Sequence, residues 1–134
     1  MDKPIYLLDT NICVFLLRGN LEVIDRFKEA GIDNCCISEI TIAELLFGAE
    51  CSSDIKHNKK LVESFCSELK VLPIYEAIET FAKEKTKLRK EGKLIDDFDL
   101  LIGATAKYYD LILISDNTKH FQRLKVNLQN WRSH

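Results

Sequence analysis

Four acidic residues stand inside or beside stretches of sequence that otherwise resemble protein core. Burial of a carboxylate in such a stretch costs free energy unless a cation pairs with it. No lysine or arginine is close in sequence to the first two of these acids. A divalent metal is therefore the leading candidate for the compensating charge, and a set of hard oxygen ligands is typical of Mg²⁺ or Mn²⁺ rather than zinc. The four residues are Asp9, Glu44, Asp99 and Asp116.

A carboxylate site of this kind supports the hydrolysis of phosphate esters. A bound metal lowers the pKa of a water molecule so that it can attack phosphorus, and the same metal or a second one about 4 Å away stabilises the charge that develops. No histidine, serine or cysteine is then needed as a nucleophile, and we expect the three histidines at the surface. The absence of a GxGxxG motif and of a phosphate-binding loop disfavours nucleotide-cofactor enzymes. The histidines are His57, His120 and His134.

Taken singly, each acid also has a structural explanation. Asp9 precedes an expected helix and suits its N-cap. Asp97 and Asp99 open another helix, where a negative charge interacts favourably with the helix dipole. The pair Asp116-Asn117 is typical of a turn. Glu44 fits such an explanation least, because its neighbours three and four residues away are not those of a solvated helix face.

Short apolar runs alternate with longer stretches of helical periodicity, which is the pattern of a mainly parallel sheet flanked by helices. The 134 residues contain no linker, repeat or low-complexity tract, so we expect one α/β domain over residues 1–134. The expected strands, about five in number, are residues 5–8, 35–37, 71–74, 111–114 and, more weakly, 126–128. The expected helices are residues 11–17, 21–30, 40–49, 54–69, 76–91 and 99–109.

The expected fold brings the acids together. In an open α/β sheet, ligands bind in the crevice beyond the carboxyl ends of the strands. Asp9 and Asp116 occupy that end of two expected strands, and Asp99 opens the helix that leads into the second of them. We therefore expect a shared acidic site at the mouth of the sheet.

Composition limits the compartment and the partners. The net charge of −2 does not by itself indicate a nucleic-acid binder. The first residues lack the pattern of a signal peptide, and no apolar run approaches the roughly 20 residues of a membrane span. Five cysteines without a CxxC pair are typical of reduced thiols in a cytoplasmic protein. We expect a cytoplasmic location and no membrane partner.

A basic stretch, residues 83–93, precedes the acids at 96–99. One interpretation is a solvated helix face with partial compensation from two glutamates. The other is a track for a nucleic-acid backbone that leads to the acidic site. Under the second interpretation the candidate contacts are Lys85, Arg89 and Lys93.

Four sequence motifs, in order, resemble those of PIN-domain ribonucleases. Leu7–Asn11 and Ile37–Ala49 resemble the first two motifs, Asp99–Ala104 the third and Ile114–Phe121 the fourth. Together they span nearly the whole chain. The length is similar to that of the VapC toxins of bacterial toxin–antitoxin pairs, which consist of little more than one PIN domain.

This resemblance implies a specific activity and specific partners. The expected fold is a parallel sheet flanked by helices, and the expected activity is a Mg²⁺- or Mn²⁺-dependent endoribonuclease. Its RNA substrate would be transfer RNA or another structured RNA, which the candidate basic contacts would bind. The chain is expected to form a homodimer, and a hetero-oligomer with a small VapB-like antitoxin whose C-terminal segment lies across the active site.

The resemblance also assigns roles by position. Asp9, Glu44 and Asp99 become metal-binding catalytic acids, with Asp116 or Asn117 filling the fourth position. Residues that would support the site are Asn11, Ser38, Thr41, Asp97 and Asn117, and Asp96 adds further acidity. The alternative to an enzyme is a degenerate, non-catalytic PIN-like module that binds RNA or protein.

Two other α/β classes with acids at the sheet mouth fit less well. A receiver-like signalling domain needs an aspartate after the third strand, where this chain has Leu72-Pro73-Ile74. A phosphatase with an aspartyl nucleophile usually carries a second acid two residues after the first, and Asn11 occupies that position. Both classes are therefore disfavoured.

Overall fold

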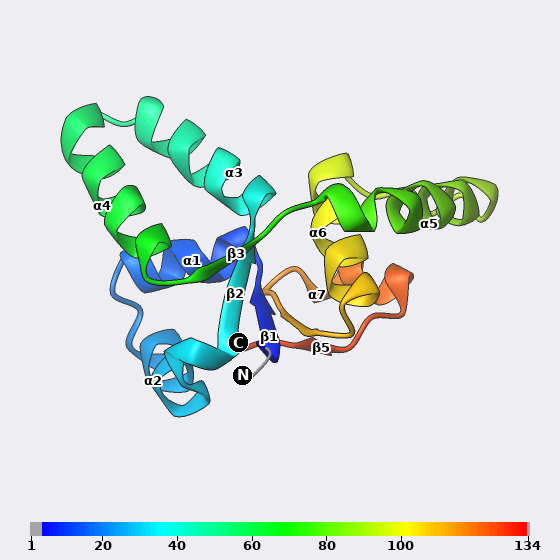
Figure 1. Ribbon diagram of the computed structural model, residues 1–134, viewed down its shortest axis with the longest axis horizontal. Helices are drawn as coiled ribbons and strands as arrows, with labels where there is room; N and C mark the ends of the chain where they lie inside the picture. Colours follow the sequence, from blue (N-terminus) through cyan, green and yellow to red (C-terminus); the bar gives the residue numbers. More distant parts are fainter. Residues whose placement is uncertain (1–3, 134) are drawn as a thin grey trace.

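The computed structural model describes residues 4–133, and these contain one five-stranded sheet in the order β3-β2-β1-β4-β5 (Figure 1). All neighbouring strands are parallel, which confirms the expected α/β architecture. The strands are β1 (Tyr6–Leu8), β2 (Cys35–Ser38), β3 (Lys70–Leu72), β4 (Ile112–Ile114) and β5 (Leu128–Gln129). The helices are α1 (Thr10–Leu17), α2 (Leu21–Ala30), α3 (Glu39–Glu50), α4 (Ile55–Ser67), α5 (Ile78–Lys90), α6 (Asp97–Tyr108) and α7 (Thr118–Phe121), with short 3₁₀ turns η1 (Ile32–Asn34), η2 (Tyr75–Ala77) and η3 (Gln122–Leu124).

Most of the long helices begin at an N-cap residue whose side-chain oxygen can accept a hydrogen bond. Each accepts a hydrogen bond from a backbone N–H of the first helical turn, which would otherwise lack a partner. These N-caps are Asp9, Asn20, Ser38, Asp54 and Asp96. Because Asp9 and Ser38 stand directly at the ends of β1 and β2, each strand passes into its helix without a loop. This places the start of α1 and the start of α3 at the same edge of the sheet.

The elements differ from the expected ones mainly at their ends. β3 ends at Leu72, two residues earlier than expected, and is followed by Pro73, which has no N–H for a sheet hydrogen bond. α6 begins at Asp97 rather than Asp99, because Asp96 is the residue that caps it. The short α7 and the 3₁₀ turns are too brief to produce a periodic pattern in the sequence. The longest helices, α4 and α5, have 13 residues, and none within residues 4–133 has the length and apolar character to cross a membrane.

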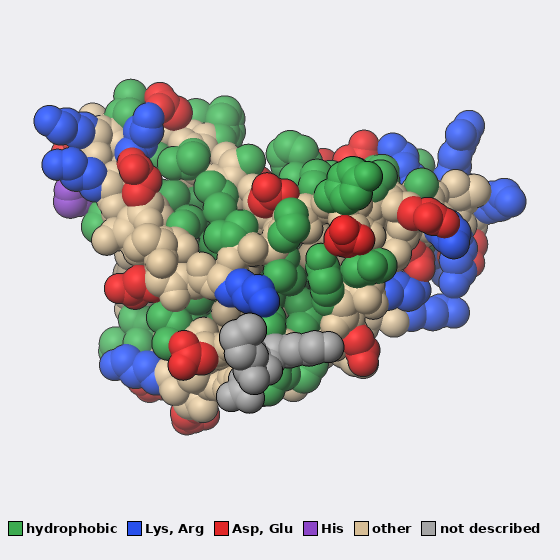
Figure 2. All heavy atoms as spheres, viewed as in Figure 1, with side chains coloured by type: hydrophobic (Ala, Val, Ile, Leu, Met, Phe, Trp, Pro, Cys, Tyr) green, Lys and Arg blue, Asp and Glu red, His purple; other side chains and the backbone are tan. Residues whose placement is uncertain are grey.

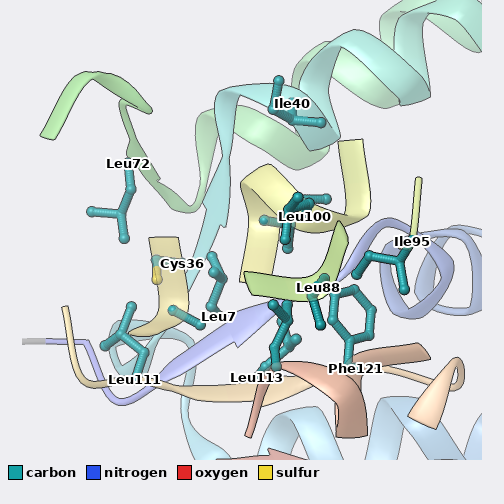
Figure 3. Packing of buried hydrophobic residues seen from close by; sticks show 13 residues of the cluster. Leu7, Cys36, Ile40, Leu72, Leu88, Ile95, Leu100, Leu111, Leu113 and Phe121 are labelled. Carbon is teal, nitrogen blue, oxygen red and sulfur yellow. The ribbon is translucent and has the colours of Figure 1, made fainter. Parts of the chain in front are cut away.

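Alternate residues of the strands face two separate hydrophobic cores, because successive side chains of a strand point to opposite faces. Leu7 and Leu113 face the core formed with α5, α6 and α7, which Figure 3 shows from close by. Leu8 and Ile114 face the core formed with the helices α1 to α4. Both faces of the sheet are therefore covered, as a parallel sheet requires.

The strand order contains one reversal. From β1 the chain adds β2 and β3 on one side, and it then adds β4 and β5 on the other. The two strands at this reversal, β1 and β4, are hydrogen-bonded neighbours. The helices that follow them pack on opposite faces, since Ile12 of α1 and Phe121 of α7 belong to different cores. A crevice opens at such a switch point beyond the carboxyl ends of the strands. Asp9 and Ser115 are the first residues after these two strands.

At Gly103, α6 packs closely against the turn that follows α7. A Cβ atom there would lie 2.3 Å from Leu124 Cδ1 and 3.4 Å from Phe121 Cδ1, and both of those side chains are buried. Alanine stabilises a helix by about 1 kcal/mol relative to glycine, whereas overpacking a core costs roughly 1–3 kcal/mol. We expect Gly103→Ala to destabilise the protein by about 1 kcal/mol in denaturant unfolding.

The matched control is Gly48→Ala in α3. Nothing lies within 4 Å of an added Cβ at that position, so the same substitution should stabilise the protein. Stabilisation by both substitutions would show that α6 and the segment after α7 are not in the contact described.

Candidate active site

Asp9 is the most buried acid of the mouth. It is 3% exposed, and two neutral groups hold its carboxylate. The backbone N–H of Thr10 donates to Oδ1 at 2.8 Å, and Ser115 Oγ donates to Oδ2 at 2.7 Å. The second bond crosses the switch point, since Ser115 follows β4 while Asp9 follows β1. The carboxylate is therefore fixed at the centre of the sheet edge.

Glu44 reaches the same mouth from the second turn of α3. Thr10 Oγ1 donates to Glu44 Oε1 at 2.6 Å and lies 3.1 Å from Thr41 Oγ1. Thr41 is fully buried one turn before Glu44, where its hydroxyl fixes the position of Thr10. The backbone N–H of Thr10 holds Asp9 and its hydroxyl holds Glu44, so a single residue links the first two acids.

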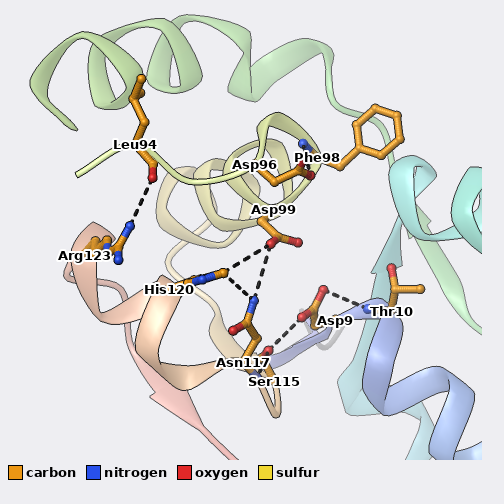
Figure 4. A network of polar contacts seen from close by, with 10 residues as sticks. All are labelled: Asp9, Thr10, Leu94, Asp96, Phe98, Asp99, Ser115, Asn117, His120 and Arg123. Carbon is orange, nitrogen blue, oxygen red and sulfur yellow. Dashed lines mark hydrogen bonds and ion pairs between the residues drawn. The ribbon is translucent and has the colours of Figure 1, made fainter. Parts of the chain in front are cut away.

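Asp99 enters from the first turn of α6. Asn117 Nδ2 donates to Asp99 Oδ2 at 3.4 Å, and His120 Nδ1 lies 3.9 Å from the same oxygen. Asn117 Nδ2 is also 2.9 Å from His120 Nδ1. Figure 4 shows the Asp99 carboxylate above this amide and the Asp9 carboxylate beside Ser115. Asp9, which caps α1, is thus brought to one edge of the sheet with Glu44 of α3 and Asp99 of α6.

Electrostatics set the site apart from the rest of the surface. Burial raises the pKa of Asp9 from 3.8 to about 6, and the negative charges of Asp99 and Glu44 add to that rise. Burial also raises the pKa of Asp99, with Asp96 and Glu44 contributing. Across residues 4–133, neither Asp9 nor Glu44 forms an ion pair, and Asp99 has only the distant His120. Repulsion among these carboxylates lowers the stability of the folded protein, and a bound cation would remove that repulsion.

The donor set suits a hard divalent cation. Carboxylate, amide and hydroxyl oxygens are the ligands that Mg²⁺ and Mn²⁺ take. Each acid here is held by neutral donors, and the second carboxylate oxygens of Glu44 and Asp99 accept no hydrogen bond from residues 4–133. As they stand, no three His, Cys, Asp or Glu side chains of the described chain lie close enough together to enclose a metal ion. Such an ion would have to draw the acids inward.

Asp116 follows Ser115 beside this site, and its carboxylate contacts the C-terminal segment. Its Oδ1 accepts from Asn130 Nδ2 at 3.0 Å, and its Oδ2 lies 3.5 Å from Arg132 Nη1. Asn117, the next residue, makes the contact with Asp99. Of the two alternatives for the fourth motif position, Asn117 is the one that contacts Asp99, and its assignment to that position stays a prediction.

The other residues singled out by the sequence have identifiable contacts. Asn11 Oδ1 accepts from the backbone N–H of Asp116 at 3.2 Å, and buried Ser38 caps α3 through the N–H of Ile40. Asp97 is turned toward α5, where it forms an ion pair with Lys85 at 2.9 Å. Exposed His57 lies on α4, and His134 lies outside the described residues.

Sequence reasoning missed several residues of the site. Thr10 and Ser115 each directly adjoin a candidate acid, but threonine and serine are common beside helix caps and turns, so the sequence alone does not single them out. His120, expected as an ordinary surface residue, is exposed but lies beside Asp99. Arg132 contacts Asp116, and no local pattern in the sequence indicates this contact.

A cleft of about 370 Å³ opens next to Glu44 between α1, α3 and α4. Its floor is mainly apolar, formed by side chains such as Val14, Leu45 and Val62, while Thr10 and Glu44 stand at one end. Arg18 lines the cleft as well. Glu44 therefore borders both the acidic site and this mainly apolar cleft.

The fold and site define an open α/β domain with a carboxylate cluster at the switch point of its sheet. The chain belongs to the PIN domain family, whose model matches residues 6–127. It is 39% identical over 131 residues to the Haemophilus influenzae ribonuclease VapC2, covering 94% of this chain and 97% of that protein. It is 33% identical over 121 residues to the Shigella flexneri tRNA(fMet)-specific endonuclease VapC, covering 89% and 91% of the two chains.

Solved structures show the same similarity. A chain in the crystal structure of DNA-bound VapBC from Salmonella typhimurium superposes with a TM-score of 0.91 at 28% identity, covering 97% of this chain and 100% of that chain. A chain of VapBC2 from Rickettsia felis, bound to a DNA fragment from its promoter, superposes with a TM-score of 0.87 at 27% identity, covering 96% and 99%. The expected PIN fold and the resemblance to VapC proteins are confirmed.

The raised pKa of Asp9 predicts how stability depends on pH. Between about pH 4 and pH 6 the folded protein holds a proton on Asp9 that the unfolded chain has released, so stability falls as the pH rises through this window. Removal of the charge by Asp9→Asn should therefore stabilise the metal-free protein at pH 7.5, by about 1–3 kcal/mol. That advantage should shrink toward pH 4. Denaturant unfolding of both proteins in chelator at several pH values measures this, and a destabilised Asp9→Asn protein at pH 7.5 would contradict it.

Proposed function

We propose that this chain is a Mg²⁺- or Mn²⁺-dependent endoribonuclease, the toxin of a type II toxin–antitoxin pair. The observation that carries the proposal is the convergence of Asp9, Glu44 and Asp99 at the switch point without a compensating lysine or arginine in residues 4–133. Relatives along almost the full length are a ribonuclease and a tRNA endonuclease, which supports RNA as the substrate. Transfer RNA is the substrate class that we test first.

Asp9, Glu44 and Asp99 would hold the metal, with Asn117 next to them. A bound Mg²⁺ or Mn²⁺ would lower the pKa of a water for attack on phosphorus and stabilise the developing negative charge. The neutral donors around the acids limit their motion: Ser115 holds Asp9, Thr10 holds Glu44 and Asn117 holds Asp99. Such outer contacts orient carboxylate ligands without competing for charge.

The acidic mouth repels a polyanion, so binding energy for RNA must come from another surface. Lysines and arginines of α5 and the loop after it supply one. Lys85 is occupied by Asp97, but Arg89 and Lys93 are exposed and have no ion-pair partner within the described chain, and the same is true of Lys87 and Lys90. Figure 2 shows lysine and arginine side chains gathered at the end of the molecule where Figure 1 places α5. We propose that Arg89 and Lys93 contact the RNA backbone.

The antitoxin would occupy the apolar cleft beside Glu44. Solved relatives include VapBC toxin–antitoxin complexes, and an apolar groove is the surface into which an amphipathic segment binds. A segment lying there would reach Glu44 and Thr10 at one end of the cleft and block access to the acids. We propose a VapB-like protein as this partner.

A homodimer is also part of the proposal. Large apolar side chains are exposed near the acidic edge, with Phe47 on α3 at 70%, Tyr75 in η2 at 76% and Phe98 on α6 at 45%. Exposed apolar groups on neighbouring elements mark a surface for protein contacts. A second copy of this chain is the partner we expect there, and the cytoplasm is the compartment we expect.

The decisive test of catalysis is cleavage of RNA by purified, antitoxin-free protein. We expect discrete cleavage of a labelled transfer RNA pool in Mg²⁺ or Mn²⁺ and none in chelator. Glu44→Gln should reduce the single-turnover rate by at least about 100-fold, because loss of a ligand costs more than loss of an outer contact. The matched control is Glu50→Gln on the same helix, whose only ion pair, within residues 4–133, is with Lys59 at the surface. It should cleave at the wild-type rate.

Metal binding without cleavage of any RNA would leave the non-catalytic PIN-like module as the correct description. Equal loss of activity in Glu44→Gln and Glu50→Gln would show that the mouth is not the active site.

The basic surface makes a separate prediction about salt. Each phosphate contact adds roughly 0.7–0.9 to the slope of log affinity against log salt. Arg89→Ala/Lys93→Ala should weaken RNA binding and reduce that slope by about 1.5, as measured with catalytically inactive Glu44→Gln protein. The control, Lys56→Ala/Lys60→Ala, removes two exposed charges on α4 at the far side of the molecule. Identical slopes for the two double variants would reject α5 as the RNA surface.

A further inference from the structure

The C-terminal segment 130–133 returns to the mouth of the sheet and holds the loop that follows β4. Asn130 Nδ2 donates to Asp116 Oδ1 at 3.0 Å, and Arg132 Nη1 lies 3.5 Å from Asp116 Oδ2. The two bonds engage both oxygens of one carboxylate. The carboxylate of Asp116 is thus held by the C-terminal segment.

The C-terminal segment is itself fixed in place. Trp131 is 2% exposed and packs its ring edge-on against Tyr6 of β1, with ring centroids 5.7 Å apart. Arg132 Cζ lies 4.6 Å from the ring centroid of Phe15 on α1. Beyond it, Ser133 Oγ donates to Glu22 Oε2 at 2.6 Å. The guanidinium is therefore held at a defined point, and a planar, stacked arginine suits this role better than a lysine.

The loop after β4 connects the fixed C-terminal segment to the acids. Asp116 is also anchored through its backbone N–H, which donates to Asn11 Oδ1 at 3.2 Å. The residues on either side of it contact the acids: Ser115 Oγ donates to Asp9, and Asn117 Nδ2 donates to Asp99. Asn117 N–H donates to Ser115 Oγ at 2.9 Å and closes the loop. The carboxylate of Asp116 thus contacts the C-terminal segment, while both of its neighbours contact the acids.

We propose that Arg132 and Asp116 form a positioning pair for the active site, and that Asp116 is an anchor rather than a metal ligand. This rests on the proposed function for its effect on catalysis. The ion pair itself contributes little stability, because the Arg132 side chain is 40% exposed and the Asp116 side chain 19%. Its effect lies in the geometry: it holds Ser115 and Asn117 against Asp9 and Asp99. Loss of such an outer contact typically costs 10–100-fold in activity or metal affinity.

Two substitutions of Asp116 separate an anchor from a ligand. Asp116→Asn keeps an oxygen that can accept a hydrogen bond, so a positioning residue should tolerate it, with single-turnover cleavage and Mn²⁺ affinity within about 3-fold of wild type. Asp116→Ala should lose about 10-fold or more in both. A metal ligand would instead be damaged by both substitutions. Calorimetric titration of Mn²⁺ without RNA provides the affinity.

Arg132 should behave as the partner of Asp116. Arg132→Ala should match Asp116→Ala, and the double variant should be no worse than either single variant, since two residues that act as one unit are not additive. The control is Arg123→Ala, which removes an arginine that donates to Leu94 O at 3.0 Å and does not contact Asp116. Additive losses, or a wild-type Arg132→Ala protein, would overturn the proposal.

Hydrogen exchange tests the structural half independently of any catalysis. In the metal-free protein, Arg132→Ala should speed exchange of the backbone N–H groups of Asp116 and Asn117, and exchange within α4 should not change. This result is expected even if the wild-type protein cleaves no RNA, so failure of the ribonuclease proposal remains distinguishable. Unchanged exchange at both residues would overturn the positioning role.

Discussion

The burial of the Asp9 carboxylate at the centre of the sheet edge is the constraint on which the site depends. β1 is the middle strand, and the chain adds strands to one side of it and then to the other. The residue that follows β1, Asp9, therefore lies in the crevice between two diverging connections. Asp9 is only 3% exposed, and this burial raises the pKa of its carboxylate to about 6. Ser115 and the backbone N–H of Thr10 stabilise this charge, whereas Asp99 and Glu44 repel it.

The neighbouring acids follow from the same topology. β2 pairs with β1 and ends in Ser38, which caps α3, and the second turn of that helix brings Glu44 to the mouth. α6 packs on the opposite face and presents Asp99 in its first turn. The three carboxylates come from segments far apart in the chain, and their charges are brought together without a matching lysine or arginine in residues 4–133. Such an arrangement is stable mainly because neutral donors hold each acid, and it favours binding of a hard cation.

Much of the fold could be predicted from the sequence because each strand is a short apolar run that ends in a polar residue. That pattern predicts β1, β2 and β4, and a parallel order of the strands then predicts which acids lie together beyond their carboxyl ends. The loop after β4 could not be predicted in this way. Adjacent residues of a loop can contact different partners, and no periodic pattern indicates which of Asp116 and Asn117 contacts Asp99. The answer depends on Arg132, which lies 16 residues beyond Asp116 and outside the fourth motif.

Calorimetric titration of Mn²⁺ into metal-free protein at pH 6, in two buffers of different ionisation enthalpy, tests most directly whether the buried acids form a cation site. With the pKa of Asp9 at about 6, roughly half of the molecules carry a proton there that the metal must displace. We predict binding with release of about half a proton per chain at pH 6 and almost none at pH 8. Absence of binding, or binding without proton release at pH 6, would contradict the proposal that Asp9 lies in a metal site.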